Sequence, residues 1–215
     1  MKRIISILLI ALMIFAFVSC NSETAKDTSS PSAKESAEVK ENTDAEAKDY
    51  VNEKFGFALT LPEGWHFMTK DEIAQNFHIE ADMIGAGLDK LTDEKASIID
   101  TVAIDAKGNN VSVAIQKNPF AEDDDIEAKL TESLATAKQA LETSGFTVNK
   151  VDVGSVKFAG VTYPCSELVS TSHQGRKSDQ KQIVIIQDGY CVYVSASALD
   201  GADPQGILDM FTELK

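Results

Sequence analysis

The stretch QKQIVIIQDGYCVYVSASA, residues 180–198, decides the fold of this chain. Its Asp188-Gly189 pair lies between two apolar runs and is typical of a two-residue β-hairpin turn. The run Gln182–Ile186 is apolar on both faces of a strand, so that both of its faces need to be covered. The stretch therefore predicts two antiparallel strands, Gln180–Gln187 and Tyr190–Ala198, in a sheet that is packed on both sides.

Further strands are predicted on both sides of this hairpin. Val161–Ser170 precedes it and completes a meander whose first turn centres near Gln174-Gly175. Apolar runs bounded by turn residues predict the remaining strands: Phe55–Leu61, which Pro62 ends, the hairpin Ile98–Ile104 and Val111–Ile115, and two short strands, Phe146–Asp152 and Ser155–Ala159, on either side of Gly154.

Three helices are predicted from their start signals. Thr69 and Glu72 have the spacing of a capping box, which predicts a short helix ending near Phe77. Asp125 precedes a long helix with apolar residues at Ile126, Leu130, Leu134, Ala137 and Leu141, and Gly145 is placed to cap its end. Asp203 and Pro204 begin a last helix, with Ile207, Leu208, Phe211 and Leu214 on its apolar face. The segment 79–95 has no clear pattern.

This order of elements predicts an α+β fold, with a central antiparallel sheet covered by helices. Four phrases carry a resemblance to a known family: Phe55-Gly56-Phe57 running to Pro62-Glu63-Gly64-Trp65, the strand Val111–Ile115, Phe158-Ala159-Gly160-Val161-Thr162-Tyr163, and the final strand from Tyr190 with the helix after it. Over residues 50–215 the chain resembles the PsbP-like superfamily, and within it the lipoproteins of Gram-positive bacteria. The resemblance implies an α/β/α sandwich and a non-enzymatic role in binding or assembly.

The N-terminal residues predict where in the cell the protein is located. Residues 1–19 combine the basic Lys2 and Arg3 with an apolar stretch too short to span a bilayer, which is typical of a signal peptide. The stretch ends in Phe17-Val18-Ser19-Cys20, which resembles a bacterial lipobox, although an ordinary secretory peptide is the alternative. Lipid on Cys20 would hold the protein at the extracytoplasmic face of the cell membrane. Residues 20–49 are poor in apolar side chains and predict a disordered tether, leaving a domain at 50–215.

The charge of the chain excludes one class of partner. The formal net charge is −14, and the domain at 50–215 has 14 basic and 26 acidic residues, a net charge of −12. Proteins that bind the phosphate backbone need a basic face, so no nucleic-acid partner is expected. The sequence contains no G-x-S-x-G, H-E-x-x-H, phosphate-binding loop or G-x-G-x-x-G motif, and we expect no catalytic residues and no cofactor.

Isolated residues that could bind a ligand have simpler interpretations. His66, His78 and His173 lack the spacing of metal ligands and are interpreted as surface residues, so no metal site is expected. Asp123, Asp124 and Asp125, with Glu122 and Glu127, could attract Ca²⁺, but acids at a helix start are favoured by the helix dipole alone. Trp65, Phe67, Phe77, Phe120 and Tyr163 could line a groove, yet core packing explains them as well.

Cys165 and Cys191 are the cysteines that remain once Cys20 is assigned to lipid. A disulfide is the first interpretation in an oxidising compartment. The predicted register places Cys165 near Val184 and Cys191 opposite Ile186, on one face but on strands flanking the same middle strand. Two strand spacings of about 4.8 Å exceed the Cα separation of about 7 Å that a disulfide tolerates. We therefore predict two buried free thiols.

Three functions remain compatible with the sequence. The first is a membrane-anchored extracytoplasmic module that binds or helps to assemble a protein partner without catalysis. The second is a carrier of a small molecule or lipid, which needs an apolar cavity between sheet and helices. The third is an envelope hydrolase, supported only by isolated Asp, Glu and Cys residues. A filled core together with an exposed apolar patch favours the first function, and a deep pocket with converging polar groups favours the other two.

Overall fold

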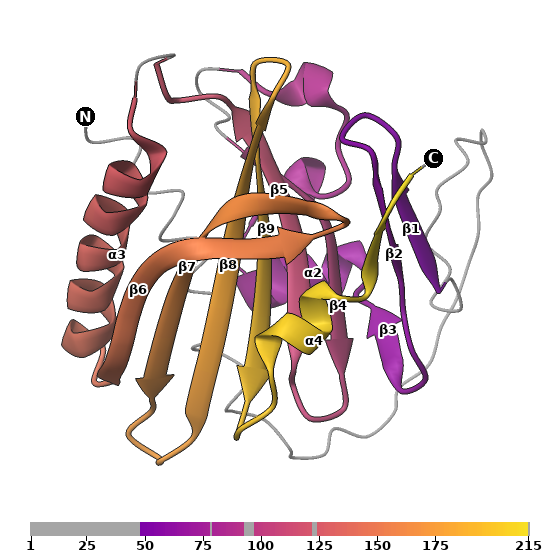
Figure 1. Ribbon diagram of the computed structural model, residues 1–215. Coiled ribbons are helices and arrows are strands. Elements are labelled where there is room, and N and C mark those ends of the chain that lie inside the picture. Colours follow the sequence, from indigo (N-terminus) through magenta and orange to yellow (C-terminus); the bar gives the residue numbers. More distant parts are fainter. Residues whose placement is uncertain (1–47, 78, 93–96, 122–123, 215) are drawn as a thin grey trace.

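The computed structural model describes residues 48–77, 79–92, 97–121 and 124–214. They form the predicted α+β fold, in which a large antiparallel sheet carries helices and a small second sheet (Figure 1). Within these ranges, no helix is both long and apolar enough to cross a bilayer. Cys20 and the residues up to 47 lie outside the described part of the chain.

The large sheet is built around the hairpin that the sequence predicts. β8 (Lys177–Gln187) and β9 (Tyr190–Leu199) pair on either side of the Asp188-Gly189 turn. The sheet has seven strands, all antiparallel to their neighbours, in the order β3 (Trp65–Phe67), β4 (Ser97–Asp105), β5 (Asn110–Lys117), β9, β8, β7 (Val161–Thr171) and β6 (Thr147–Phe158).

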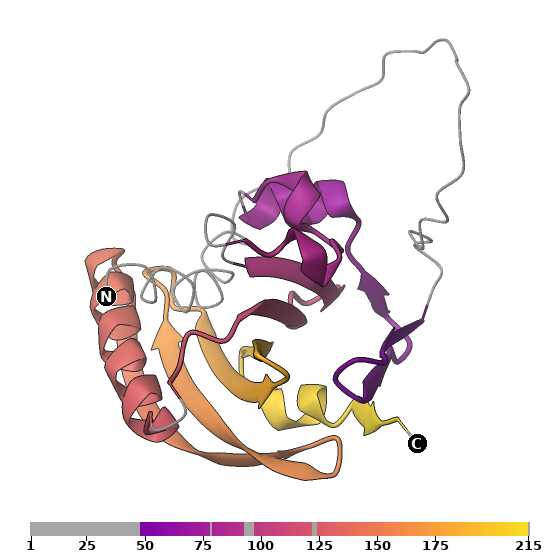
Figure 2. The same cartoon turned by 90° about the horizontal axis from the view of Figure 1, so that it is seen from above.

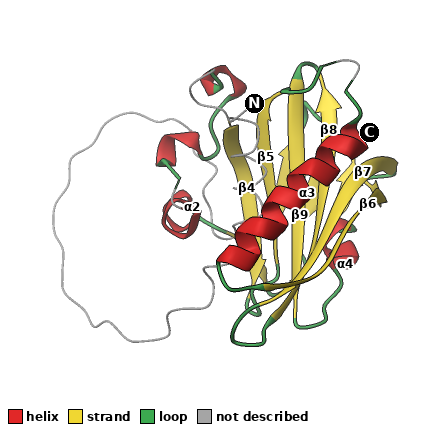
Figure 3. Ribbon diagram, turned by 90° about the vertical axis from the view of Figure 1, so that its left-hand side faces the viewer, coloured by secondary structure: helices red, strands yellow, loops and turns green. Residues whose placement is uncertain are grey.

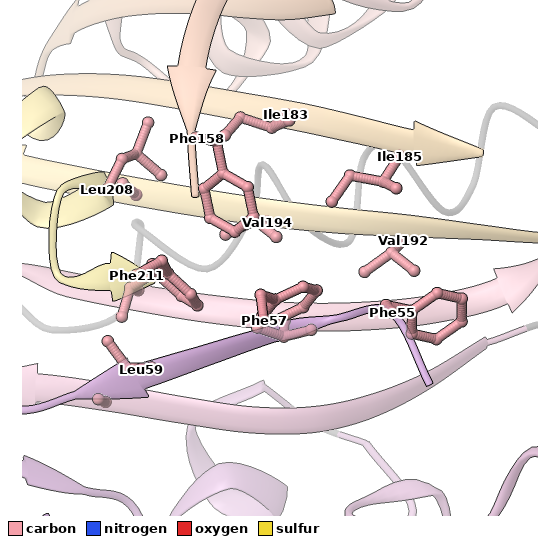
Figure 4. Close-up of a cluster of buried hydrophobic side chains, with 14 of the residues drawn as sticks. Phe55, Phe57, Leu59, Phe158, Ile183, Ile185, Val192, Val194, Leu208 and Phe211 are labelled. Carbon is pink, nitrogen blue, oxygen red and sulfur yellow. The ribbon is translucent and has the colours of Figure 1, made fainter. Parts of the chain in front are cut away.

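One face of this sheet packs against a small sheet and a short helix. The small sheet has the order β1 (Asp49–Asn52), β2 (Phe57–Thr60) and β10 (Phe211–Glu213), and the helix is α4 (Pro204–Leu208). Between the layers, the ring centroids of Phe57 and Phe158 lie 5.4 Å apart and those of Phe158 and Phe211 lie 4.8 Å apart. Figure 4 shows these rings pointing toward Val192, Val194 and Ile183 of the large sheet. The aromatic side chains therefore fill the space between the two sheets.

The other face carries the longer helices. α3 (Ile126–Thr143) packs Leu130, Leu134 and Ala137 on one apolar cluster of the sheet, and α2 (Lys70–Phe77) packs Ile73 on another. Two 3-10 turns, η1 (Ala81–Met83) and η2 (Leu88–Lys90), follow α2 in the segment that lacked a clear pattern. Seen from above, α2 and α3 lie on one side of the sheet and α4 lies on the other (Figure 2). α3 crosses the strands obliquely (Figure 3).

The predicted start signals of α2 and α3 are both confirmed. The Glu72 N–H donates to Thr69 Oγ1 at 3.3 Å and the Thr69 N–H donates to Glu72 Oε2 at 2.8 Å, which is the predicted capping box. The Asp125 carboxylate accepts from the Ala128 N–H at 3.1 Å, and Gly145 has a φ of +87° just after α3. A left-handed backbone at that position favours glycine.

The last helix is shorter than predicted. α4 begins after Asp203, whose carboxylate accepts from the Gln205 N–H, but it ends at Leu208. Phe211 and the residues after it form β10, which pairs with β2 through Phe211 opposite Leu59. An extended backbone gains these hydrogen bonds and inserts Phe211 between Phe57 and Phe158, so tertiary packing overrides the helical pattern that included Phe211 and Leu214.

Other boundaries also differ from the predictions. The two short strands expected around Gly154 are one continuous strand, β6, because every residue from 150 to 158 pairs with β7. β3 was not predicted and begins at Trp65, which pairs with Asp105. The unpredicted β1 pairs with β2, which itself spans only part of the expected Phe55–Leu61 strand.

A buried polar cluster joins the two sheets. The Tyr50 hydroxyl of β1 donates to the Asp100 carboxylate of β4, and Asn52 Nδ2 donates to the same Asp100 oxygen at 3.0 Å. Asp100 lies at a β-bulge between Ile99 and Thr101. Burial raises the pKa of Asp100 more than these two hydrogen bonds lower it. The folded protein therefore holds a proton on Asp100 more tightly than the unfolded chain does.

Truncation of Phe57 tests whether the aromatic layer stabilises the fold. Phe57→Ala is expected to lower the free energy of unfolding by about 3–5 kcal/mol, because the side chain is only 1% exposed and packs against three other rings. Urea unfolding followed by circular dichroism measures this. The control is Val51→Ala, at a side chain that is 53% exposed in the same small sheet, with an expected change below about 0.5 kcal/mol. Equal effects of the two variants would contradict the assigned core.

Asp100→Asn tests the polar cluster through its pH dependence. Because the folded pKa is raised, the contribution of Asp100 to stability is greatest at low pH and falls as pH rises from about 4 through the folded pKa. An Asn at this position keeps an acceptor oxygen but does not ionise. Urea unfolding from pH 4 to 7 should therefore show the variant gaining stability relative to wild type as pH rises. A difference that stays constant over this range would show that Asp100 has an ordinary pKa.

Candidate functional site

The residues that sequence patterns singled out do not form one site. His66 of β3 and His173 of the β7–β8 turn are both exposed and lie on separate elements, and His78 lies outside the described ranges. Asp125 caps α3 and Asp124 accepts from the Ala121 N–H, while Glu122 and Asp123 are likewise not described. Among the described residues, no group of three His, Cys, Asp or Glu side chains is placed to hold a metal ion.

The five aromatic residues considered for a groove are divided among the three apolar clusters. Trp65, Phe67 and Tyr163 pack against the cluster between the two sheets. Phe120 packs against the cluster below α3, and Phe77 against the cluster below α2. Their shared role is to extend the core, as the simpler interpretation predicted, and they line no common groove.

The two remaining cysteines are buried free thiols, as predicted, but their register differs from the prediction. Cys165 lies opposite Ile183 rather than Val184, because the β7–β8 turn has three central residues, His173–Gly175, with Gly175 at a φ of +82°. Cys191 lies opposite Ile186, so the two thiols are on opposite faces of the sheet and not on one face. Burial raises the pKa of Cys165 to about 11 and that of Cys191 to about 12. Both groups are protonated near neutral pH and are poor nucleophiles.

Polar side chains gather in two rows on the sheet face that carries α3. We name them the polar rows. The register aligns the first row across β5, β9, β8 and β7, and the second across β5, β9 and β8. The first row is Ser112, Ser195, Gln182 and Ser166, and the second is Asn110, Ser197 and Gln180. All seven side chains are between 0% and 4% exposed.

Apolar clusters flank the polar rows on the same face. Toward β7, α3 packs on a cluster that contains Val184, Leu168 and Tyr193. Toward β4, α2 and η1 pack on a cluster that contains Ile99 and Val102, and Val102 lies directly opposite Ser112. The rows thus interrupt an otherwise apolar surface, between the regions that the two helices cover.

The polar rows satisfy only part of their own hydrogen-bonding capacity. Gln182 Nε2 donates to Ser195 Oγ at 2.9 Å, and Asn110 Nδ2 donates to the Gly108 carbonyl at 3.1 Å. Gln182 Oε1, Asn110 Oδ1 and Gln180 Nε2 are buried and have no hydrogen-bond partner among the described residues. A buried polar atom without a partner costs about 1–3 kcal/mol, and folded proteins contain few of them. Three such atoms of the described chain thus lie on this one face.

The chemistry of the polar rows is neutral. Their hydroxyl and amide groups donate and accept hydrogen bonds but do not exchange protons near neutral pH. Tyr193 and Cys191 are ionisable residues of β9 on the same face, and burial raises the pKa of both. General acid–base catalysis needs a group with a pKa near the working pH, and the hydroxyl and amide groups of the polar rows do not provide one.

A charged hollow on the opposite face is a separate feature. It has a volume of about 540 Å³ and includes Lys150, Glu167, Lys177 and Asp179 in its lining. Lys150 Nζ lies 2.5 Å from Glu167 Oε2, so the opposite charges of these two side chains compensate each other. Burial, and then the nearby Glu167 charge, raise the pKa of Asp179, but the hollow is widely open to solvent. Salt bridges in such exposed places contribute little.

The alternation of polar and apolar residues is the one sequence pattern that the polar rows share. Polar residues alternate with apolar ones in Asn110-Val111-Ser112 and Ser195-Ala196-Ser197, and Gln180 and Gln182 are similarly two residues apart. Such alternation is typical of a solvent-facing sheet surface. Only the pairing of β5, β9 and β8 collects the three pairs on one face, and only the packed structure makes them buried.

No protein-family model matches the chain, and no curated protein does. Similar solved structures include the cyanobacterial PsbP (CyanoP) of Synechocystis sp. PCC 6803, at 13% identity and a TM-score of 0.45, covering 82% of this chain and 98% of the other. LpqN of Mycobacterium tuberculosis, described as involved in cell envelope biogenesis, has 17% identity and a TM-score of 0.38, covering 74% and 83%. A Bacteroides thetaiotaomicron VPI-5482 protein has 10% identity and a TM-score of 0.39, covering 78% and 48%.

Gln180→Leu tests whether the polar rows are held at a cost to stability. Gln180 Nε2 is buried and has no hydrogen-bond partner among the described residues. Replacing Gln180 by an apolar side chain of similar size is therefore expected to raise the free energy of unfolding by about 1 kcal/mol. Urea unfolding of the variant against wild type measures the change. Gln139→Leu, at an exposed position of α3, is the matched control with an expected change within about 0.5 kcal/mol. A loss of stability in Gln180→Leu would mean that this amide already has a partner inside the protein.

Proposed function

We propose that this chain is a lipid-anchored extracytoplasmic module that binds a protein partner without catalysing a reaction. The observation that carries the proposal is the set of neutral, buried polar rows with three unpartnered side-chain atoms. Groups of this kind form hydrogen bonds with a partner and do not supply a nucleophile or a proton at neutral pH.

The filled core argues against transport of an apolar molecule between the two sheets. A carrier of lipid or another apolar molecule needs an apolar cavity between the layers, and pockets for small ligands have volumes of about 300–1,000 Å³. Here Phe57, Phe158 and Phe211 fill the space between the two sheets, with ring centroids 4.8–5.7 Å apart. The carrier is therefore the second candidate, and an envelope hydrolase has no supporting arrangement among the described residues.

The anchor is proposed from Cys20 and the apolar stretch before it. Diacylglycerol on this cysteine would keep the domain at the outer face of the membrane, where a protein partner can meet it. The acidic domain, with its net charge of −12, would be repelled by anionic lipid headgroups, so the anchor and not the domain surface would provide membrane attachment.

Replacement of Cys20 tests the anchor. In Cys20→Ala we expect no incorporation of labelled palmitate and release of the protein from the membrane fraction, because the acceptor thiol is gone. Cys165→Ala is the matched control, since its buried thiol should leave labelling and membrane retention unchanged. Cell fractionation and autoradiography measure both properties. Membrane retention of Cys20→Ala equal to that of wild type would contradict lipid anchoring.

Crosslinking on intact cells, together with native mass spectrometry, tests the binding role. Anchored wild-type protein treated with an amine-reactive crosslinker should give a discrete adduct with one other polypeptide. The purified chain without its anchor should show no bound small molecule. A co-purified non-covalent mass, with no protein adduct on cells, would instead identify the protein as a carrier.

A further inference from the structure

We propose that β6 is a surface through which two copies of this chain associate, edge to edge and antiparallel. β6 has 12 residues and is the last strand of the seven-stranded sheet, where β7 is the one described strand that pairs with it. The β6–β7 hairpin lies along the outer margin of the molecule (Figure 2). An edge strand presents backbone N–H and C=O groups with which another strand can pair. The proposal goes beyond the binding of a different protein, because the partner is a second copy.

Two hydrogen bonds identify the backbone groups on the free edge of β6. The Val153 N–H donates to Asp152 Oδ1 at 3.0 Å, and the Lys157 carbonyl accepts from Gln205 Nε2 at 3.3 Å. Neither bond is made to β7, and the backbone groups of alternate residues point to the same side of an antiparallel strand. Because pairing with β7 is continuous from 150 to 158, the backbone groups of Val151 also point to the free edge.

The symmetry of a pair of edges fixes which residues meet. In an antiparallel dimer the two-fold axis is perpendicular to the sheet, so each residue meets one from the same face of the other copy. An axis at Val151 pairs this residue with its own copy through two hydrogen bonds, because its backbone groups point outward. Each Lys150 then lies opposite Asp152 of the second copy. Opposite charges therefore meet twice across the dimer.

The side chains of Lys150 and Asp152 are accessible for these two contacts. They are 47% and 61% exposed, and Lys150 Nζ lies 3.7 Å from Asp152 Oδ2 of its own chain. Residues two apart on a strand are separated by about 6.8 Å. Directly opposite residues that flank a hydrogen-bonded pair have Cα atoms only about 4.5 Å apart. Each Asp152 carboxylate therefore approaches a lysine more closely across the dimer than within its own chain.

Val151 and the order of the charges favour a second copy over an unrelated strand. The Val151 side chain is 38% exposed and lies opposite Leu168 on the face that carries α3, so self-pairing buries two valines against each other. Charged side chains on an edge strand ordinarily prevent pairing with other strands. A strand without a complementary order of charges would place like charges opposite each other, which is destabilising. Self-pairing of β6 avoids that repulsion.

Charge reversal tests the proposal on residues 20–215 with Cys20→Ala. In sedimentation equilibrium the average mass of this chain should rise toward that of a dimer as its concentration increases. Asp152→Lys places lysine opposite lysine and Lys150→Glu places Glu opposite Asp, so each variant alone should associate about tenfold more weakly or less. An equimolar mixture of the two variants restores both pairs of opposite charges. Native mass spectrometry of the mixture should therefore show the mixed dimer.

Two further variants separate edge pairing from other contacts. Val151→Pro removes an N–H that the dimer uses and should abolish association. An edge strand tolerates proline where its N–H faces solvent, and the thermal midpoint of the variant checks that it is folded. Lys157→Glu is the matched control, because it reverses a charge on the same strand outside the paired residues. Its association should equal that of the parent chain.

Three results would overturn this proposal. The first is a parent chain that stays monomeric up to about 1 mM. The second is a dimer that Val151→Pro leaves unchanged, which would place the contact elsewhere on the molecule. The third is a mixture of Asp152→Lys and Lys150→Glu that associates no better than either variant alone. An adduct with a different polypeptide on intact cells would still support the proposed function in each case, so the two proposals can fail separately.

Discussion

The fold depends on the need to cover the β8–β9 hairpin on both faces. Ile183 and Ile185 face the aromatic cluster of the small sheet, while Val184 of the same strand faces α3. A strand that is apolar on both sides cannot lie at a surface, because each exposed side chain would forfeit about 1.5–3 kcal/mol of burial energy. The small sheet with α4 on one face, and α2 and α3 on the other, meet this requirement.

The polar rows are the exception within the same strands. β8 and β9 are apolar on both faces near their shared turn, but toward the opposite end Gln180, Gln182, Ser195 and Ser197 replace the apolar residues on the α3 face. On β9, the residues that alternate with the two serines, Ala196 and Ala198, stay in the core. Local conflicts with good packing are expected where a protein keeps a function at some cost in stability. This contrast makes the polar rows the candidate site.

Much of the fold followed from sequence patterns because local signals and tertiary packing agree there. The Asp188-Gly189 turn, the Thr69–Glu72 capping box and the Asp125 cap each depend on neighbouring residues only, and each is confirmed. The C-terminal strand was missed because Phe211 has helical spacing and reaches its place only by pairing with β2. The faces of Cys165 and Cys191 were wrong because a one-residue difference in the β7–β8 turn reverses the faces along a strand.

The candidate site was not predictable in the same way. Serine and glutamine at alternate positions indicate a solvent-facing surface, and no pattern within one strand shows that neighbouring strands align seven such residues. Whether an amide is left without a partner depends on everything packed around it. Burial and hydrogen bonding in the folded chain, not residue type, therefore distinguish the polar rows from an ordinary sheet surface.

The most direct measurement is the two-dimensional ¹⁵N–¹H NMR spectrum of the side-chain amide groups while the protein partner identified by crosslinking is added. If the polar rows bind the partner, the NH₂ signals of Asn110, Gln180 and Gln182 shift together, since these amides gain hydrogen-bond partners. The signals of Gln139 and Gln187 should stay in place. If other signals shift and those of Asn110, Gln180 and Gln182 do not, the polar rows are not the binding site.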